Sequence, residues 1–312
     1  MIHKKRCERV FIIEGSRAVQ GDSTGGSAVL IRCWGARGSI PVSGPEYVKY
    51  GGDTPCIEIR SADDDMVIVD AGSGIRALGN SLVEQGRHEY TLLLTHGHWD
   101  HIIGFPFFKP LQNPRTRVNV YGCPFERNSL KDVLAPSMSP PSFPIQIEDL
   151  KAEVFYHEIC SDCFDIGPLN VCTINLSHPN QGLGFRFTEA GASFVFLTDN
   201  ELLYRHPGGR DYADYVAFAR GADVLIHDAE YMPHEYALKK TWGHTVYTDA
   251  LQLALDAGVK RFGLFHHNQD RTDTAIDAMV EDCRRIVSER SAELDVFGAR
   301  QGMDIEIASV RR

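Results

Sequence analysis

The sequence YTLLLTHGHWDH at residues 90–101 decides the fold, because an apolar run ends within it at a group of polar side chains. A short apolar run bounded by polar residues is typical of a buried strand. Four side chains follow this strand closely: His96, His98, Asp100 and His101. Proteins with α/β folds usually place their ligand sites at the ends of strands. Imidazole and carboxylate groups are good ligands for zinc and manganese, so the stretch predicts a metal site.

A chance polar loop is the alternative interpretation, and for an isolated histidine it would be preferred. Four ligand types at this spacing are themselves the signal of a metal site. The chain here resembles the metallo-β-lactamase superfamily, whose signature H-x-H-x-D-H follows a strand. The resemblance implies an αββα sandwich, in which two mixed β-sheets are flanked by helices and hold a binuclear hydrolytic centre. It also implies that His96 and His98 bind one ion, whereas Asp100 and His101 bind the other.

The resemblance implies further site residues at the ends of other strands. Asp70 matches a carboxylate that orients the metal-binding loop, although a helix cap is the other interpretation. His178 becomes the third ligand of the first ion, and Asp199 the carboxylate that bridges both ions. His266 becomes the last ligand of the second ion, with His267 as the competing candidate.

The motifs I-H-D-A, G-H-T and L-F-H-H in the last third of the chain narrow the resemblance. They are similar to those of the branch that contains tRNase Z and the cyclic-nucleotide and cyclic-phosphate phosphodiesterases. This resemblance implies that His244 is a catalytic acid that faces the scissile phosphate, with Asp228 orienting it. A histidine held by a carboxylate is a typical general acid near neutral pH. Asp100 is expected to serve in catalysis as well as in metal binding.

The predicted activity is that of a binuclear metal-dependent phosphodiesterase. Two divalent ions, zinc first and manganese second, would polarise a phosphoryl oxygen and provide a metal-bound hydroxide as the nucleophile. No convincing G-x-S-x-G or Cys-His signature competes with that nucleophile, because the GDSTG match at residues 21–25 falls in a flexible composition without periodicity. The expected substrates are small cyclic phosphodiesters, with 3′,5′-cyclic nucleotides first among them.

Charge and spacing favour a small substrate over a long nucleic acid. The formal net charge of −10 argues against a protein held to nucleic acid by many phosphate contacts. The interval between His178 and Asp199 has room only for a hairpin, whereas long-armed tRNA 3′-processing enzymes, by resemblance, carry an extended basic arm there. Two alternatives stay open: a tRNA 3′-end endonuclease, and a lactonase or thioesterase on the same fold, which would not require His244.

Length and composition set the expected organisation. With 312 residues and 43% hydrophobic content, the chain can bury a large core. Residues 1–27 lack periodicity and predict a flexible N-terminal arm, and residues 28–312 are expected to form a single domain. The proline-rich segment 135–144 predicts an irregular loop over the active site or at a homodimer contact.

Location and redox state are predicted from apolar runs and cysteines. No apolar stretch is long enough to span a membrane, and the run at 10–13 is too short for a secretory signal, so a cytoplasmic protein without a membrane partner is expected. The eight scattered cysteines predict reduced thiols rather than a disulfide framework. The lone C-x-x-C at 160–163 has no second half, so a structural zinc or redox role is not the expected one.

Overall fold

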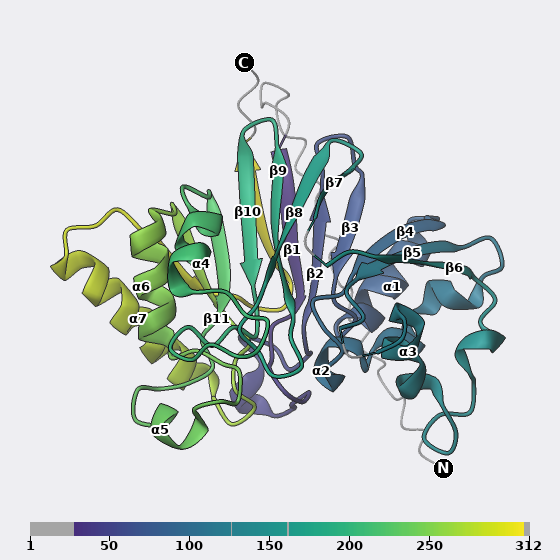
Figure 1. Ribbon diagram of the computed structural model, residues 1–312, viewed down its shortest axis with the longest axis horizontal. Coiled ribbons are helices and arrows are strands. Elements are labelled where there is room, and N and C mark those ends of the chain that lie inside the picture. The colour runs from purple at the N-terminus through teal and green to yellow at the C-terminus, as the bar shows by residue number, and fades with distance from the viewer. Residues whose placement is uncertain (1–27, 126, 161, 309–312) are drawn as a thin grey trace, which may run out of the picture.

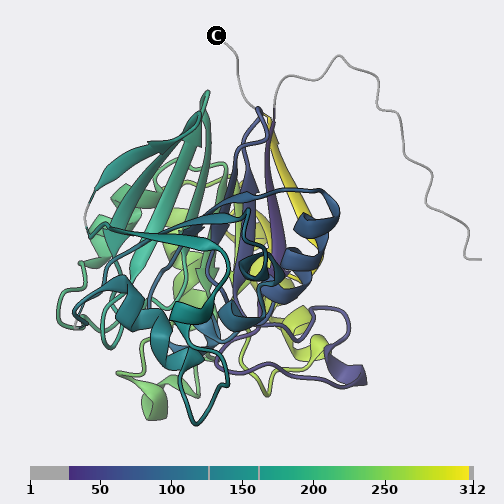
Figure 2. The same cartoon turned by 90° about the vertical axis from the view of Figure 1, so that its right-hand side faces the viewer.

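The computed structural model describes residues 28–125, 127–160 and 162–308, which form two seven-stranded β-sheets. The two sheets lie in the middle of the molecule, and helices cover their outer sides (Figures 1 and 2). The predicted αββα sandwich of two mixed sheets is confirmed. The arm predicted at residues 1–27 lies outside the described residues.

The first sheet has the strand order β14-β1-β2-β3-β4-β5-β6. Its pairs are antiparallel from β14 to β3 and parallel from β3 to β6. The strands are β1 (Ala28–Gly35), β2 (Cys56–Arg60), β3 (Met66–Val69), β4 (Glu89–Leu93), β5 (Arg117–Gly122), β6 (Glu153–Glu158) and β14 (Met303–Ala308).

The second sheet has the order β13-β12-β11-β10-β9-β8-β7. Its pairs are parallel from β13 to β10 and antiparallel from β10 to β7. The strands are β7 (Cys163–Ile166), β8 (Leu169–Asn175), β9 (Leu183–Glu189), β10 (Ala192–Leu197), β11 (Val224–Asp228), β12 (Arg261–Phe265) and β13 (Asp295–Gly298).

The helices divide between the two outer faces. In Figure 1, α1 and α3 lie beside the first sheet, and α4, α6 and α7 beside the second. Two short helices, α2 and α5, lie toward the lower edge of that view. The helices are α1 (Ile75–Glu84), α2 (Trp99–Ile102), α3 (Leu130–Leu134), α4 (Tyr212–Ala219), α5 (Tyr236–Lys239), α6 (Tyr247–Ala257) and α7 (Asp273–Glu289).

Alternation along the strands builds three apolar layers. In β10, Phe194 and Phe196 pack into the core between the sheets, whereas Val195 and Leu197 face the helices of the second sheet. In β3, Ile68 faces outward into the layer that contains α1. Successive side chains of a strand point to opposite faces, so a strand that is covered on both faces is apolar throughout. This double coverage explains why these strands show as continuous apolar runs in the sequence.

Two disulfides correct the prediction of reduced thiols. Cys123 pairs with Cys160, and Cys163 pairs with Cys172. The partners lie on neighbouring strands or directly after them, which brings their Cα atoms to 4.8 Å and 4.1 Å. The two cysteines of the C-x-x-C therefore join different strands. The cysteines that remain free in the described part of the chain are all buried: Cys33, Cys56 and Cys283.

Two smaller expectations can be compared with the fold. The proline-rich segment is irregular apart from a 3₁₀ turn at Ala135–Met138. Among the residues that the structure describes, no helix combines the length and the apolar character needed to cross a membrane.

Candidate metal centre

Strand ends bring the predicted site residues to one edge of the sandwich. His96 to His101 follow β4 and enter α2, and Asp70 follows β3, the parallel neighbour of β4. Asp199 follows β10 and His266 follows β12, with the parallel strand β11 between them. Parallel strands end at the same edge of a sheet, so residues far apart in sequence meet there.

Three of these strand-end residues have unusual backbone angles. The φ angles of Asp70, Asp199 and His266 are 63°, 56° and 54°. These values lie in the left-handed region of the backbone, which residues other than glycine rarely adopt. Such backbone strain collects at functional sites, where the surrounding structure holds it. Each sharp turn directs a side chain across the end of its strand instead of along the alternating pattern of the sheet.

The first half of the cluster contains three histidines and Asp199. His96, His98, His178 and Asp199 each offer one ligand atom, and these atoms all lie within 4.8 Å of one another. Nε2 of His178 lies 2.9 Å from Nδ1 of His98 and 3.7 Å from Oδ2 of Asp199. Nε2 of His96 lies 3.6 Å from the same carboxylate oxygen. The four side chains converge as ligands of one ion would.

The second half of the cluster shares Asp199 with the first. Nε2 of His266 lies 3.0 Å from Oδ2 of Asp100 and 3.4 Å from Oδ1 of Asp199. Nε2 of His101 lies 3.4 Å and 3.3 Å from the same two oxygen atoms. Asp199 therefore directs Oδ1 toward one group of ligands and Oδ2 toward the other, as a bridging carboxylate would.

Two buried nitrogen atoms test whether this cluster fits a cation. Nε2 of His96 and Nε2 of His101 are buried and have no hydrogen-bond partner among the described residues. A buried polar atom without a partner is costly and calls for an explanation. Both atoms point toward carboxylate oxygens, and imidazole with carboxylate is a suitable donor set for zinc or manganese. The fold and the cluster together fit a divalent metal centre.

The outer nitrogens of the same two rings are held by neighbours. Nδ1 of His101 lies 2.7 Å from Oδ2 of Asp70, and Nδ1 of His96 lies 3.0 Å from the hydroxyl of Thr95. Thr95 in turn donates its backbone N–H to Asp70 at 2.8 Å. A carboxylate at Nδ1 fixes the ring so that Nε2 presents its lone pair to a metal. The geometry thus places the Asp70 carboxylate at Nδ1 of His101, on the side of the ring opposite Nε2.

The carboxylates and imidazoles shift one another's pKa values. Burial favours the neutral acid, yet the imidazoles of His266 and His101 keep the pKa of Asp199 well below its ordinary value. Burial lowers the pKa of His178 to about 3. Burial also disfavours the charged form of His101, but Asp100 and Asp199 outweigh it and raise that pKa well above the ordinary value. The second half of the cluster, which contains Asp100, His101 and Asp199, therefore attracts positive charge, either as protons or as a metal ion.

The pair of His244 and Asp228 lies against the cluster. Nδ1 of His244 is 3.1 Å from Oδ2 of Asp228, and its ring stacks on that of His266 with centroids 4.7 Å apart. Burial opposes the charge, but Glu230, then Asp228 and Asp199, raise the pKa of His244 to about 9. A charged, oriented imidazole can donate a proton. The same ring also forms a third candidate ligand group with Asp199 and His266, because its Nδ1 lies 3.9 Å from Asp199.

Glu230 is a site residue that the sequence analysis did not identify. Its side chain is buried, and Oε2 lies 2.9 Å from Nδ1 of His266 and 3.4 Å from Nε2 of His244. Asn268 donates to its other oxygen at 2.9 Å. The sequence did offer a signal for Glu230, because this acidic residue lies two positions beyond Asp228, just after the same apolar strand.

His267 points away from the cluster, unlike its neighbour. Its Nε2 lies 2.7 Å from the backbone oxygen of Ala299, and its ring packs edge-on against Tyr50. Of the two adjacent histidines, the structure therefore brings only His266 to the candidate ligands.

The stretch at residues 36–39, which follows β1, forms hydrogen bonds with the loop after His266. Arg37 is fully buried, and its guanidinium donates to the backbone oxygens of Asn268 and Arg271 at 3.2 Å and 2.8 Å. Gly38 donates to the backbone oxygen of His267 at 2.8 Å, and Ser39 donates to Asp100 at 2.9 Å. This stretch thus contacts Asp100, which is a candidate ligand, and also the segment that follows His266, another candidate ligand.

A substitution at Asp70 tests the outer support of the cluster. Asp70→Asn should weaken zinc affinity by ~10–100-fold, because an amide cannot support the Nδ1 proton of His101 as a carboxylate does. Asparagine tolerates the left-handed backbone, so the turn itself should remain. Zinc titration against a competing chelator measures the effect, with Asp63→Asn at the exposed end of the preceding turn as the matched control. Unchanged affinity would show that Asp70 has only a structural role.

Comparison with known proteins gives matches along most of the chain. The family described as "Beta-lactamase superfamily domain" matches residues 66–267. A ribonuclease Z of Picrophilus torridus is 24% identical over 288 residues, covering 79% of this chain and 88% of that protein.

Solved structures agree with this fold at low sequence identity. The metallo-β-lactamase fold protein YhfI from Bacillus subtilis superposes with a TM-score of 0.66 at 18% identity, covering 90% of this chain and 100% of that one. A diphosphatase from the PhnP family gives a TM-score of 0.63 at 19% identity, covering 90% and 98% of the two chains.

Proposed function

Because the chain belongs to the β-lactamase superfamily as a metal-dependent hydrolase, of the phosphodiesterase or nuclease type, we propose that its substrates are small cyclic phosphodiesters. The 3′,5′-cyclic nucleotides are the first candidates. One observation carries the proposal: the imidazole–carboxylate pair of His244 and Asp228 lies directly beside a cluster suited to two ions. A metal centre can activate a phosphodiester for attack, and a proton donor then assists the departure of its unactivated alkoxide.

In this proposal the seven clustered side chains hold two divalent ions, with zinc expected before manganese. When bound, the two ions would supply Lewis-acid polarisation of the phosphoryl group and lower the pKa of water. The ligands would be His96, His98 and His178 for one ion, Asp100, His101 and His266 for the other, and Asp199 for both.

The protein's own groups would then handle the proton and the orientation of the donor. Asp228 holds Nδ1 of His244, which leaves the Nε2 proton for the departing oxygen. Glu230 lies 3.4 Å from Nε2 and favours the charged ring. Glu230 also lies 2.9 Å from Nδ1 of His266, which leaves Nε2 of that ring free for a metal, and Asp100 would serve in catalysis as a ligand of the same ion.

The connection between His178 and Asp199 supports a small substrate. Residues 183–197 form only the β9–β10 hairpin, and each residue between His178 and Asp199 is described. No extended arm is therefore inserted between these two positions. The net charge of −10 also disfavours a long polyanion.

An RNA 3′-end endonuclease is the second candidate function. The observation that favours it is the similarity to ribonuclease Z, which extends over 88% of that protein. The hairpin at β9–β10 and the acidic charge are the observations against it.

A substrate comparison tests the proposal. Protein loaded with zinc or manganese should hydrolyse 3′,5′-cyclic nucleotides and bis(p-nitrophenyl) phosphate with a higher kcat/KM than it cleaves precursor tRNA. The Asp199→Asn variant, purified in the same way, controls for contaminating nucleases. Faster cleavage of precursor tRNA at its 3′ end than of any small cyclic diester would contradict the proposal and favour the endonuclease.

A further inference from the structure

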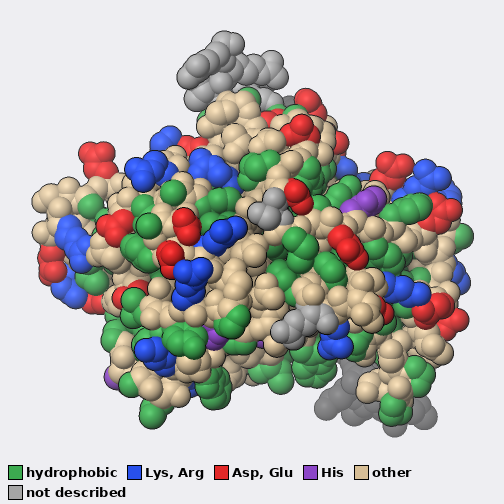
Figure 3. Space-filling view, in the orientation of Figure 1, with side chains coloured by type: hydrophobic (Ala, Val, Ile, Leu, Met, Phe, Trp, Pro, Cys, Tyr) green, Lys and Arg blue, Asp and Glu red, His purple; other side chains and the backbone are tan. Residues whose placement is uncertain are grey.

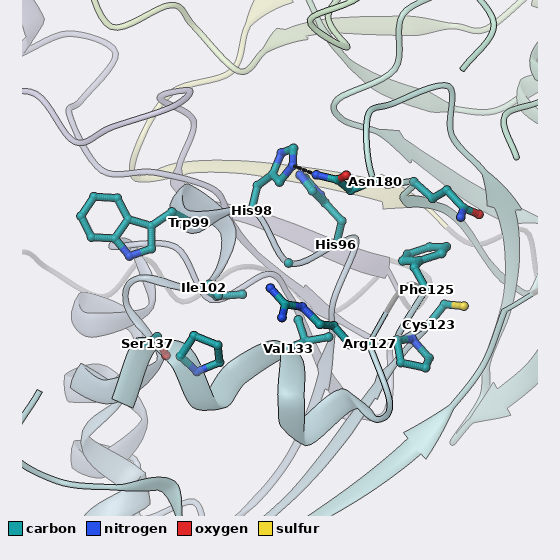
Figure 4. A pocket seen from close by; sticks show the side chains of 14 residues that line it. His96, His98, Trp99, Ile102, Cys123, Phe125, Arg127, Val133, Ser137 and Asn180 are labelled. Atoms are coloured by element: carbon teal, nitrogen blue, oxygen red, sulfur yellow. Dashed lines mark hydrogen bonds between the residues drawn. The ribbon is translucent and has the colours of Figure 1, made fainter. Parts of the chain in front are cut away.

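A cavity of about 480 Å³ opens beside the first half of the cluster (Figure 4). His96 and His98 form one wall, and Asn180 and Gln181, which follow His178, form the adjacent one. Small-molecule sites commonly have volumes of a few hundred Å³ or more. A ligand in this cavity would contact the candidate metal centre directly.

The rest of the lining combines apolar faces with polar groups. Ile102, Phe125, Val133 and Pro136 are apolar, and the last of these belongs to the proline-rich segment. In Figure 4 the Phe125 ring and the Arg127 side chain are directed toward the enclosed space, whereas the indole of Trp99 points away. Apolar walls with a few polar groups suit a flat ring that has apolar faces and a polar edge.

Arg127 is the cationic side chain of this lining, and it is not engaged elsewhere. Among the described residues, its guanidinium has neither an ion pair nor a side-chain hydrogen bond, whereas nearby Lys131 pairs with Glu148 at 2.6 Å. The side-chain amide of Asn180, in contrast, lies 3.3 Å from Nε2 of His98. Arg127 is therefore a cationic side chain of the lining that is available to a ligand. It offers only donors, in a fixed planar arrangement.

We propose that this cavity binds the nucleobase of a cyclic nucleotide, and that Arg127 makes it prefer guanine. The inference rests on the proposed phosphodiesterase function, because it assumes that the phosphate lies at the cluster. Guanine presents two adjacent acceptors, O6 and N7, which match the two donors of a guanidinium. Adenine presents a donor next to N7, so one of the two hydrogen bonds would be lost.

Kinetics with three substrates test the base subsite. Wild-type protein should prefer cyclic GMP over cyclic AMP in kcat/KM, and Arg127→Ala should lower the value for cyclic GMP by about 5- to 150-fold. The value for bis(p-nitrophenyl) phosphate, which has no base, should change by less than about two-fold. Arg115→Ala, at an exposed arginine that does not line the cavity, is the matched control and should leave all three values unchanged.

Two further variants separate base recognition from other roles. Arg127→Gln should shift the preference toward cyclic AMP, because an amide can donate to N7 and accept from N6 of adenine. Phe125→Leu should raise KM for both cyclic nucleotides, because it removes the aromatic face but keeps an apolar side chain.

The possible failures are distinguishable. Equal losses for all three substrates in Arg127→Ala would overturn the inference and assign Arg127 to the phosphate. Equal kcat/KM for cyclic GMP and cyclic AMP in the wild type would overturn it as well. If the metal-loaded protein hydrolysed none of the three substrates, the proposed phosphodiesterase function itself would be refuted instead.

Discussion

Asp199→Ala should remove nearly all activity and most of the bound metal. Loss of an outer hydrogen-bond partner of a metal ligand costs ~10–100-fold, and loss of the shared carboxylate should cost more than this range. The physical reason is that Oδ1 lies near His101 and His266, whereas Oδ2 lies near His96 and His178. Elemental analysis of the purified variant, together with kcat/KM for bis(p-nitrophenyl) phosphate, measures both losses.

The control for this experiment is Asp199→Asn. Asparagine has the same shape and accepts the left-handed backbone found at this position, so the fold should be preserved while the charge is lost. Far-ultraviolet circular dichroism of both variants should match that of the wild type. Two equivalents of metal retained in Asp199→Ala would contradict a bridging role for this carboxylate.

His244→Ala should keep its metal and lose turnover. A general acid typically contributes ~10²–10⁴-fold, and that loss is expected for a cyclic nucleotide, whose alkoxide leaving group needs a proton. The loss should be smaller for bis(p-nitrophenyl) phosphate, because p-nitrophenolate departs without one. Metal content and kcat for both substrates give the measurement. Asp228→Asn should follow the same pattern more mildly, because it disturbs the orientation of the ring without removing it.

Other outcomes for His244 would assign it a different role. Equal losses for both substrates would show that it positions the phosphate. Loss of one metal equivalent would show that it is a ligand, which its distance of 3.9 Å from Asp199 makes a direct alternative. Hydrolysis of a lactone or a thioester at the wild-type rate by His244→Ala would favour those substrates, because their chemistry does not require this proton donor.

The sequence predicted the parts of this molecule that depend on local pattern. Strand β4 shows as an apolar run because it is covered on both faces, and the polar residues after it belong to the candidate metal centre. The β9–β10 hairpin follows from two apolar runs separated by a short turn. Asp70, His178 and Asp199 could be placed because each ends such a run and matches the family motif.

Contacts between distant segments could not be predicted in this way. Glu230 lies beside His266 only because β11 and β12 are parallel neighbours, and Arg37 reaches the same region from the segment that follows β1 of the other sheet. The choice between His266 and His267 depends on the left-handed turn at His266, which breaks the alternation of the strand. The disulfides likewise depend on strand pairing, which brings Cys123 next to Cys160.

Metal reconstitution tests the central claim most directly. Protein stripped with a chelator should be inactive on bis(p-nitrophenyl) phosphate, and its activity should return as zinc or manganese is added, up to two equivalents per chain. The seven clustered side chains and the shared position of Asp199 predict this stoichiometry. Full activity in protein shown by elemental analysis to be free of metal, or no activity after both metals have been bound, would contradict the account.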